Sequence, residues 1–184
     1  MKLLQSGYFT GEVMVLDRTT GIPDEVVREI RNCRLLGFDT ETRPSFKKGR
    51  INKVALIQLS TDSRAYLIRC SQLGLTGSII SILQDPKIIK VGVAIREDLK
   101  ALRRLTEFKP DGFIELQEFV NDYGIESNGL RGIAGIVLKI KISKSQQLSN
   151  WEIERLSDAQ LQYAATDAWA CHEIYRTLNE EADG

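Results

Sequence analysis

Two acidic residues end an apolar stretch near the N-terminus of the sequence. The segment LLGFDTET, residues 35–42, has the character of a β-strand and places Asp39 and Glu41 two residues apart. Side chains at i and i+2 lie on the same face of a strand, so both carboxylates point one way. Hard divalent cations prefer carboxylate oxygens, and a strand would hold them rigidly. The pair therefore predicts either metal ligands or a strand end with a capping Asp and a solvated Glu.

A third acid, Asp98, lies in the segment VGVAIREDLKAL, residues 91–102. VGVAI is typical of a strand and DLKALRRL of a helix, so Asp98 falls near a junction where sites gather in open α/β sheets. The alternatives are an ordinary first-turn acid favoured by the helix dipole, or a role for the adjacent Glu97. A dinucleotide fingerprint is excluded, because G-x-G-x-x-G is absent.

The segment YAATDA places Tyr163 and Asp167 four residues apart on a predicted helix, hence on one face. Ala164, Ala165 and Ala168 surround them, and such small residues would let this helix approach a sheet closely. The alternative is that Tyr163 packs in the core while Asp167 is an exposed helix acid.

His172 is the single histidine of the chain, and it follows Asp167 by five residues on the same predicted helix. It therefore points away from Asp167 and is interpreted as structural or exposed. Ser-His-Asp and Cys-His mechanisms would depend on it and are not supported. Lys plus Arg and Asp plus Glu are balanced at 25 each, so any binding of a polyanion must come from local patches.

Composition predicts one globular domain over residues 1–184, because 42% of the residues are hydrophobic and no linker or repeat divides the chain. Cys33, Cys70 and Cys171 have no metal-ligand spacing and are expected to be small buried thiols in a reducing compartment. Neither a signal peptide nor an apolar run long enough to span a bilayer is present. We expect no membrane partner, and a cytoplasmic protein if bacterial or a nuclear one if eukaryotic.

Periodicity predicts the order of elements that would position these acids. Expected strands cover residues 12–17, 35–41, 53–60, 64–70, 87–93 and 113–116, the third and fourth forming a hairpin. Expected helices cover residues 22–33, 76–84, 95–105, 116–124, 130–140 and 157–181. Ser157 and Gln160 form a capping box that opens the last helix. This order predicts an α/β fold, a mixed sheet with helices on both faces.

The acids and the tyrosine, in their order and context, resemble the DEDD superfamily of 3′–5′ exonucleases. Tyr163 is similar to the tyrosine of its Y-type subgroup, since Gln162 stands where the H-type subgroup has histidine. The resemblance covers about residues 12–178 and implies a ribonuclease H-like fold. Within the subgroup, the chain resembles the Werner-syndrome-type exonuclease domain more than ribonuclease D in the segments FIELQEFVNDYG and KSQQLSNWEIERLSDAQLQYAATDA. Ribonuclease D usually has Asp at the position of Glu115. The helical domains that follow in ribonuclease D are missing, which predicts a stand-alone nuclease or an excised domain.

The resemblance implies two Mg²⁺ or Mn²⁺ ions, with a bridging role for Asp39. Glu41 and Asp167 would complete the site that activates water, and Asp98 would hold the second ion. Tyr163 would orient the attacking water. The implied reaction removes nucleoside 5′-monophosphates from a free 3′ end of DNA or RNA, with DNA favoured.

Substrate contacts are predicted around a basic loop. The segment RPSFKKGR carries cations and one aromatic side chain that could hold phosphates and stack a base: Arg43, Phe46, Lys47, Lys48 and Arg50. A solvated loop is the alternative. Lys144 and Trp151 match the subgroup pattern and would either contact nucleic acid or dock their loop, with packing preferred for Trp151. Three other functions stay open: a nucleic-acid-binding module of weak activity, a ribonuclease D-like exoribonuclease and a ribonuclease H-like endonuclease.

Overall fold

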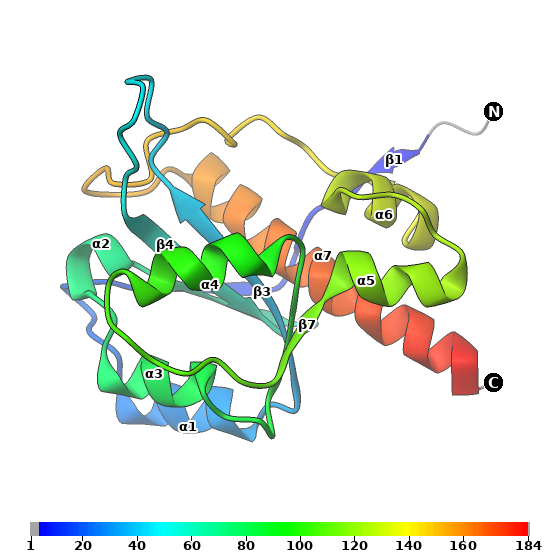
Figure 1. Cartoon of the computed structure of the whole chain (residues 1–184), viewed down its shortest axis with the longest axis horizontal. Helices are drawn as coiled ribbons and strands as arrows, with labels where there is room; N and C mark the ends of the chain where they lie inside the picture. Colours follow the sequence, from blue (N-terminus) through cyan, green and yellow to red (C-terminus); the bar gives the residue numbers. More distant parts are fainter. Residues whose placement is uncertain (1–3, 184) are drawn as a thin grey trace.

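A computed structural model describes residues 4–183, and a six-stranded mixed sheet forms its centre (Figure 1). The strands follow the order β2-β5-β4-β3-β6-β7. Their bounds are Glu12–Leu16 for β2, Leu35–Thr42 for β3, Val54–Ser60 for β4, Arg64–Ile68 for β5, Ile89–Gly92 for β6 and Phe113–Glu115 for β7. The β3–β4 and β4–β5 pairs are antiparallel and the other neighbours are parallel, which confirms the predicted mixed sheet and its hairpin.

Helices cover both faces of the sheet, as the sequence predicts (Figure 1). One face carries α1 (Asp24–Asn32), α3 (Gly77–Leu83) and α4 (Ile95–Arg103), and the other carries α5 (Leu116–Phe119), α6 (Leu130–Val137) and α7 (Asp158–Asp183). Two apolar clusters correspond to the two faces. Phe38 of β3 packs with Val26 and Ile79 in one, and Val91 of β6 packs with Ile133 in the other. Burial of apolar surface on both faces makes the central strands rigid supports.

The long helix α7 crosses β3 and β4 at close range. The predicted capping box is confirmed, since the Ser157 amide donates to Gln160 Oε1 at 3.0 Å and the Gln160 amide donates to Ser157 Oγ at 3.2 Å. Ala164, Ala165 and Ala168 are fully buried. These small side chains bring the helix backbone near the sheet, and with it the side chains that α7 presents to β3.

The structure differs from the predicted elements near the ends of several segments. The predicted helix over residues 116–124 divides into α5 and a 3-10 helix, η1 (Val120–Tyr123), and ends at Gly124 as expected. The predicted helix over 130–140 stops at Val137, because Lys139 takes a left-handed conformation with φ 60°. Two short strands, β1 (Gln5–Ser6) and β8 (Ile140–Lys141), pair with each other and lacked a periodic signal at this length. The predicted strand over 64–70 stops at Ile68, and a short helix, α2 (Cys70–Leu73), follows.

The cysteines and the histidine have structural environments. Cys70 and Cys171 are buried, Cys33 is half-buried, and all three are free thiols. His172 is buried and its Nδ1 lies 3.0 Å from Glu173 Oε1, so the structural interpretation is confirmed. Over residues 4–183, none of the helices combines the length and the apolar character needed to cross a bilayer.

Candidate active site

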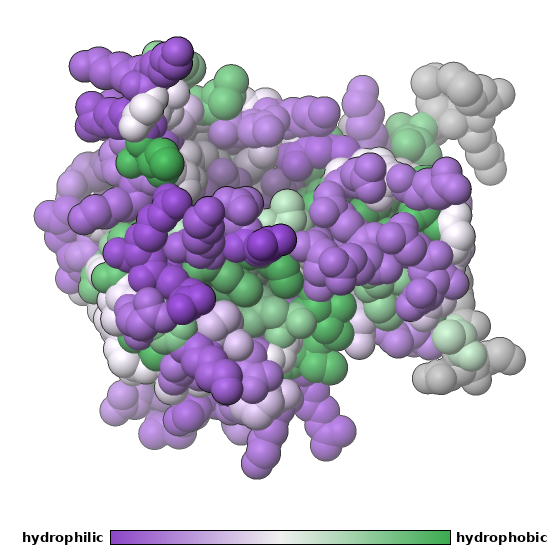
Figure 2. Space-filling view, viewed as in Figure 1, coloured by the Kyte–Doolittle hydropathy of each residue, from purple (hydrophilic) through white to green (hydrophobic). Residues whose placement is uncertain are grey.

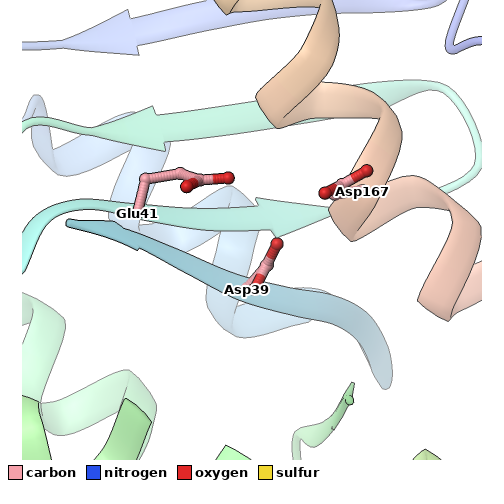
Figure 3. Close-up of side chains that lie close together, drawn as sticks. All are labelled: Asp39, Glu41 and Asp167. Carbon is pink, nitrogen blue, oxygen red and sulfur yellow. The ribbon is translucent and has the colours of Figure 1, made fainter. Parts of the chain in front are cut away.

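Three carboxylates gather where α7 crosses β3. Asp39 and Glu41 come from β3 and Asp167 from α7, and each offers an oxygen within 4.8 Å of the others. Figure 3 shows the three side chains directed toward a common space between the strand and the helix. The prediction that Asp39 and Glu41 share a strand face, and that Asp167 faces them, therefore agrees with the structure. We call Asp39, Glu41 and Asp167 the acid cluster.

The strand geometry explains why the two acids of β3 point together. Asp39 pairs with Gln58 across the antiparallel ladder, and Glu41 pairs with Leu56. Directly paired residues share a face of the sheet, so all four side chains lie on the side that α7 covers. The register shifts after Glu41, where the ladder toward the loop becomes irregular. The acids thus occupy the last regular positions of a strand whose other end is buried.

Burial and mutual repulsion raise the pKa values of the acid cluster. Burial raises the pKa of Asp39 well above its ordinary value, and the charges of Asp167 and Glu41 raise it further. The pKa of Glu41 rises to about 8, first through burial and then through Asp167. Burial also raises the pKa of Asp167 to about 6, against the opposing charge of Arg131. Converging carboxylates that resist ionisation fit a divalent cation, which would neutralise them and accept their oxygens as ligands.

Asp98 lies beside this group rather than in it. Its Oδ1 accepts a hydrogen bond of 2.7 Å from Thr40 Oγ1, a side chain on the opposite face of β3 from Asp39. Asp98 is still close enough for its charge to raise the pKa of Asp39. Its own pKa rises to about 6, mainly through burial. The structure therefore places Asp98 at the edge of the acid cluster, held by Thr40.

Glu115 fixes the start of the helix that carries Asp98. Its two carboxylate oxygens accept hydrogen bonds of 2.9 Å from the amides of Ala94 and Ile95. Ala94, the N-cap of α4, has a left-handed backbone with φ 57°, and its methyl side chain has no oxygen that could accept from these amides. A carboxylate at a helix N-terminus is also favoured by the helix dipole. Glu115 thus contributes by orienting α4, a role that the sequence analysis did not predict.

Tyr163 lies one helical turn before Asp167, and the structure buries most of its side chain. Its hydroxyl accepts a hydrogen bond of 2.9 Å from Arg131 Nη2. Burial, and next the charge of Asp167, raise the pKa of Tyr163 above its ordinary value. The phenol therefore stays protonated at neutral pH and is available as a hydrogen-bonding group next to the acid cluster.

Trp151 is buried, which agrees with the preferred packing role and not with the alternative of a substrate contact. Its side chain has 0% exposure, and its ring centroid lies 5.9 Å from that of Tyr163. It packs with Leu56 and Leu67 beneath α7. With no exposed surface it offers no face to a nucleic-acid base, so it supports Tyr163 from inside the core.

The other predicted substrate contacts are on the surface. The loop between β3 and β4 projects from the body of the molecule, and its surface is mainly hydrophilic (Figures 1 and 2). Phe46 is 87% exposed at this loop, and Lys47, Lys48 and Arg50 are exposed beside it. Arg43 is exposed and forms an ion pair of 3.3 Å with Glu152. Lys144, on the segment after β8, is exposed as well. The exposed Arg and Lys side chains are therefore accessible to phosphates, and the exposed ring of Phe46 is accessible to a base.

Two polar residues at the site were missed by the sequence analysis. Gln58 has 0% exposure and pairs with Asp39 across the ladder, and its side-chain amide lowers the pKa of the neighbouring Glu41 carboxyl. Arg131 contacts both Tyr163 and Asp167 from α6. A lone amide in the apolar run VALIQLS, and a lone cation in the apolar run LRGIAGIVL, were the available signals. Neither signal identifies what the side chain contacts, because the neighbouring residues belong to other elements: β3 for Gln58 and α7 for Arg131.

Without metal, we expect the free energy of unfolding to fall as the pH rises from 4.5 to about 8, the interval between the ordinary and folded-state pKa of Glu41. In this interval the folded protein keeps a proton that the unfolded chain has released, so a higher pH favours unfolding. Each such proton contributes a slope of about 1.4 kcal/mol per pH unit. Asp98 and Asp167 add to the fall between 3.8 and about 6. Urea unfolding in EDTA at a series of pH values measures this fall in the free energy of unfolding.

The variant Glu41→Gln should show a shallower fall, whereas substitution of the exposed acid Glu118 by Gln should leave the slope unchanged. Mn²⁺ should remove most of the fall, because a bound cation keeps the acids ionised in the folded state. A stability that is constant or that rises over this pH range in EDTA would contradict the raised pKa of Glu41.

Comparison with known proteins gives a consistent result. A family model described as 3′–5′ exonuclease matches residues 17–183. The chain is 32% identical over 168 residues to the mouse (Mus musculus) bifunctional 3′–5′ exonuclease/ATP-dependent helicase WRN, a match that covers 88% of this chain and 12% of that protein. It is 32% identical over 130 residues to ribonuclease D of Haemophilus influenzae, covering 70% of this chain and 33% of that protein.

Among solved structures, that of Trypanosoma brucei RNase D in complex with RNA U12 matches with a TM-score of 0.79 at 22% identity, covering 92% of this chain and 63% of that one. This likeness confirms the ribonuclease H-like fold. The chain spans about an eighth and a third, respectively, of the two curated relatives that it matches.

Proposed function

Because this chain belongs to the 3′–5′ exonuclease family, we propose that it hydrolyses phosphodiester bonds at the 3′ ends of nucleic acids and releases nucleoside 5′-monophosphates. One observation carries the proposal: the oxygens of Asp39, Glu41 and Asp167 converge within 4.8 Å, with Tyr163 one helical turn away. We further propose that residues 1–184 form a single exonuclease domain. The family assignment agrees with the resemblance seen in the sequence.

Divalent cations fit the acid cluster, and we propose Mg²⁺ or Mn²⁺, two ions per site. Asp39 would contribute to both positions, Glu41 and Asp167 to one, and Asp98 to the other after release from Thr40. When bound, the ions would supply Lewis-acid stabilisation of the attacking and leaving oxygens in an in-line displacement. Support comes from the convergence of the buried carboxylates of Asp39 and Glu41 with Asp167, because a divalent cation would offset the repulsion that, with burial, raises their pKa values.

The chain itself supplies orientation. Tyr163 accepts a hydrogen bond from Arg131 and keeps its own O–H as a donor on the side of Asp167, whose pKa a hydrogen bond with Tyr163 lowers. We propose that this hydroxyl holds the attacking water in line with the scissile bond. A proton-abstracting role does not fit, because the pKa of Tyr163 is raised above 10 and the phenol stays protonated.

Nucleic acid would reach this site along exposed cations. We propose that Arg43, Lys47, Lys48 and Arg50 contact backbone phosphates, that Phe46 stacks on a base and that Lys144 adds a further phosphate contact. We propose DNA as the preferred substrate. An exoribonuclease is the second candidate, favoured by the likeness to ribonuclease D in sequence and to an RNA-bound RNase D in structure.

The proposed reaction predicts stepwise shortening of a linear oligonucleotide from its 3′ end in Mn²⁺. A 5′-labelled strand should give a ladder of progressively shorter products, and a 3′-labelled strand should release labelled mononucleotide first. EDTA should abolish both, because the acid cluster then lacks its cations. Matched DNA and RNA strands in the same assay rank the two substrates. Release of 5′-terminal mononucleotide first would contradict the assigned polarity.

A circular single strand separates this reading from an endonuclease, since an exonuclease leaves it intact. Metal-dependent binding of the linear strand without any shortening would instead support the alternative of a nucleic-acid-binding module.

A further inference from the structure

Arg131 joins the two α7 residues of the candidate site. Its Nη2 donates to the Tyr163 hydroxyl at 2.9 Å and lies 3.2 and 3.1 Å from the two carboxylate oxygens of Asp167. It also donates to the Ser143 carbonyl at 2.9 Å. The guanidinium carbon lies 5.3 Å from the centre of the Tyr163 ring. One side chain from α6 therefore contacts the proposed water-orienting hydroxyl and a proposed metal ligand together.

The burial of this ion pair distinguishes it from the surface pairs of the protein. The Asp167 side chain is 4% exposed and that of Arg131 is 23% exposed. Arg176, which pairs with Glu173 and Glu180 on α7, is 42% exposed. A charge pair shielded from water interacts more strongly than one at the surface, and removal of one partner leaves the other uncompensated. The Arg131–Asp167 pair is therefore able to influence the site's charge balance.

One donor of the Arg131 side chain is not hydrogen-bonded, and this shows which contacts hold the side chain in its observed conformation. Its Nε is buried and has no hydrogen-bond partner within residues 4–183. An unpaired buried donor costs about 1–3 kcal/mol. The side-chain conformation of Arg131 is therefore held by its terminal nitrogen Nη2, which contacts Tyr163, Asp167 and the Ser143 carbonyl.

We propose that Arg131 is a positioning residue that holds the Tyr163 hydroxyl and the Asp167 carboxylate in their working orientation, and that it is the internal counter-ion of the acid cluster before metal binds. The inference rests on the proposed function, because the working orientation is defined by that reaction. The competing reading is that Arg131 binds a substrate phosphate directly, and the kinetic test below separates the two.

The kinetic test compares Arg131→Gln with the unsubstituted protein on a linear oligonucleotide in saturating Mn²⁺. We expect kcat to fall by about 10- to 100-fold, because displacing a catalytic group by about 1 Å lowers the rate by up to that amount. KM should change by less than about threefold, because the lost interaction is not with the substrate. An unchanged kcat, or a loss carried by KM, would overturn the positioning role.

A double-variant cycle tests whether Arg131 acts through Tyr163. In a Tyr163→Phe background the hydroxyl is absent, so Arg131→Gln should lower kcat much less than it does alone. Losses that multiply independently in the two backgrounds would overturn the coupling. Arg131→Lys keeps the charge but not the planar donor geometry, and it should recover only part of kcat.

A second experiment needs no activity and tests the counter-ion role by thermal unfolding at pH 8. In EDTA, Arg131→Gln should unfold at a lower temperature than the unsubstituted protein, because the carboxylates then repel without compensation. Mn²⁺ should raise the unfolding temperature more in Arg131→Gln than in the unsubstituted protein, since the ion replaces the lost charge. Arg131→Lys should resemble the unsubstituted protein.

Arg176→Gln is the matched control, because it removes an arginine that pairs with Glu173 and Glu180 on α7, away from the acid cluster. Its response to Mn²⁺ should equal that of the unsubstituted protein. An equal or smaller Mn²⁺ effect in Arg131→Gln would overturn the counter-ion role. If the unsubstituted protein shortens no nucleic acid, the proposed function fails, while the unfolding experiment still decides whether Arg131 balances the cluster.

Discussion

The variant Asp39→Asn is expected to lose about a thousandfold in kcat/KM on a linear oligonucleotide, which corresponds to roughly 4 kcal/mol of activation free energy. Asp39 is central to the site, since the charges of Asp167, Glu41 and Asp98 all act on its carboxyl group. Asparagine keeps the size and shape of the side chain but removes the charge that would hold a cation. The measurement is the single-turnover rate in Mn²⁺.

The same substitution should stabilise the metal-free protein, because it removes one of the repelling carboxylates. We therefore expect a higher unfolding temperature in EDTA together with the loss of activity, a combination that general misfolding cannot produce. Glu118→Gln removes an exposed acid and is the control for both measurements. Retention of more than about a tenth of the activity by Asp39→Asn would contradict a metal-binding role for this residue.

Gly37→Ala is expected to destabilise the protein severely, by about 3 kcal/mol or more. A Cβ at this position of β3 would lie 1.7 Å from the carbonyl oxygen of Ala168 and 3.0 Å from the amide of His172. Both are backbone atoms of α7, so no side-chain rotation relieves the overlap. The helix would have to move away from the strand, and Asp167 would move with it. Urea unfolding, or the yield of folded protein, measures the effect.

Gly77→Ala is the matched control for this prediction. A Cβ at Gly77 meets no atom of the described part of the chain within 4 Å, and the residue opens α3. Alanine there should leave stability unchanged or raise it by about 0.5–1 kcal/mol through its helix propensity. A Gly37→Ala protein as stable as Gly77→Ala would show that α7 does not approach β3 as closely as the structure indicates.

Local patterns allowed most of the elements to be predicted from the sequence. The alternation in LLGFDTET fixed the common face of Asp39 and Glu41, and the capping box fixed the start of α7. Short elements were not predicted, because a two-residue strand such as β8 carries no periodicity. The end of α6 was also missed, since the left-handed conformation of Lys139 has no signature in its residue type.

The sequence by itself determined which residue types could do chemistry and which neighbours along one element share a face, since these follow from the periods of 2 and 3.6. Only the tertiary structure decided which faces meet. It brought Asp167 close to Asp39 and Glu41 and hydrogen-bonded Asp98 to Thr40. It buried Trp151 as well. It also brought Arg131 to Tyr163. Such contacts depend on how helices pack against the sheet, and packing is set by the whole core rather than by any local pattern.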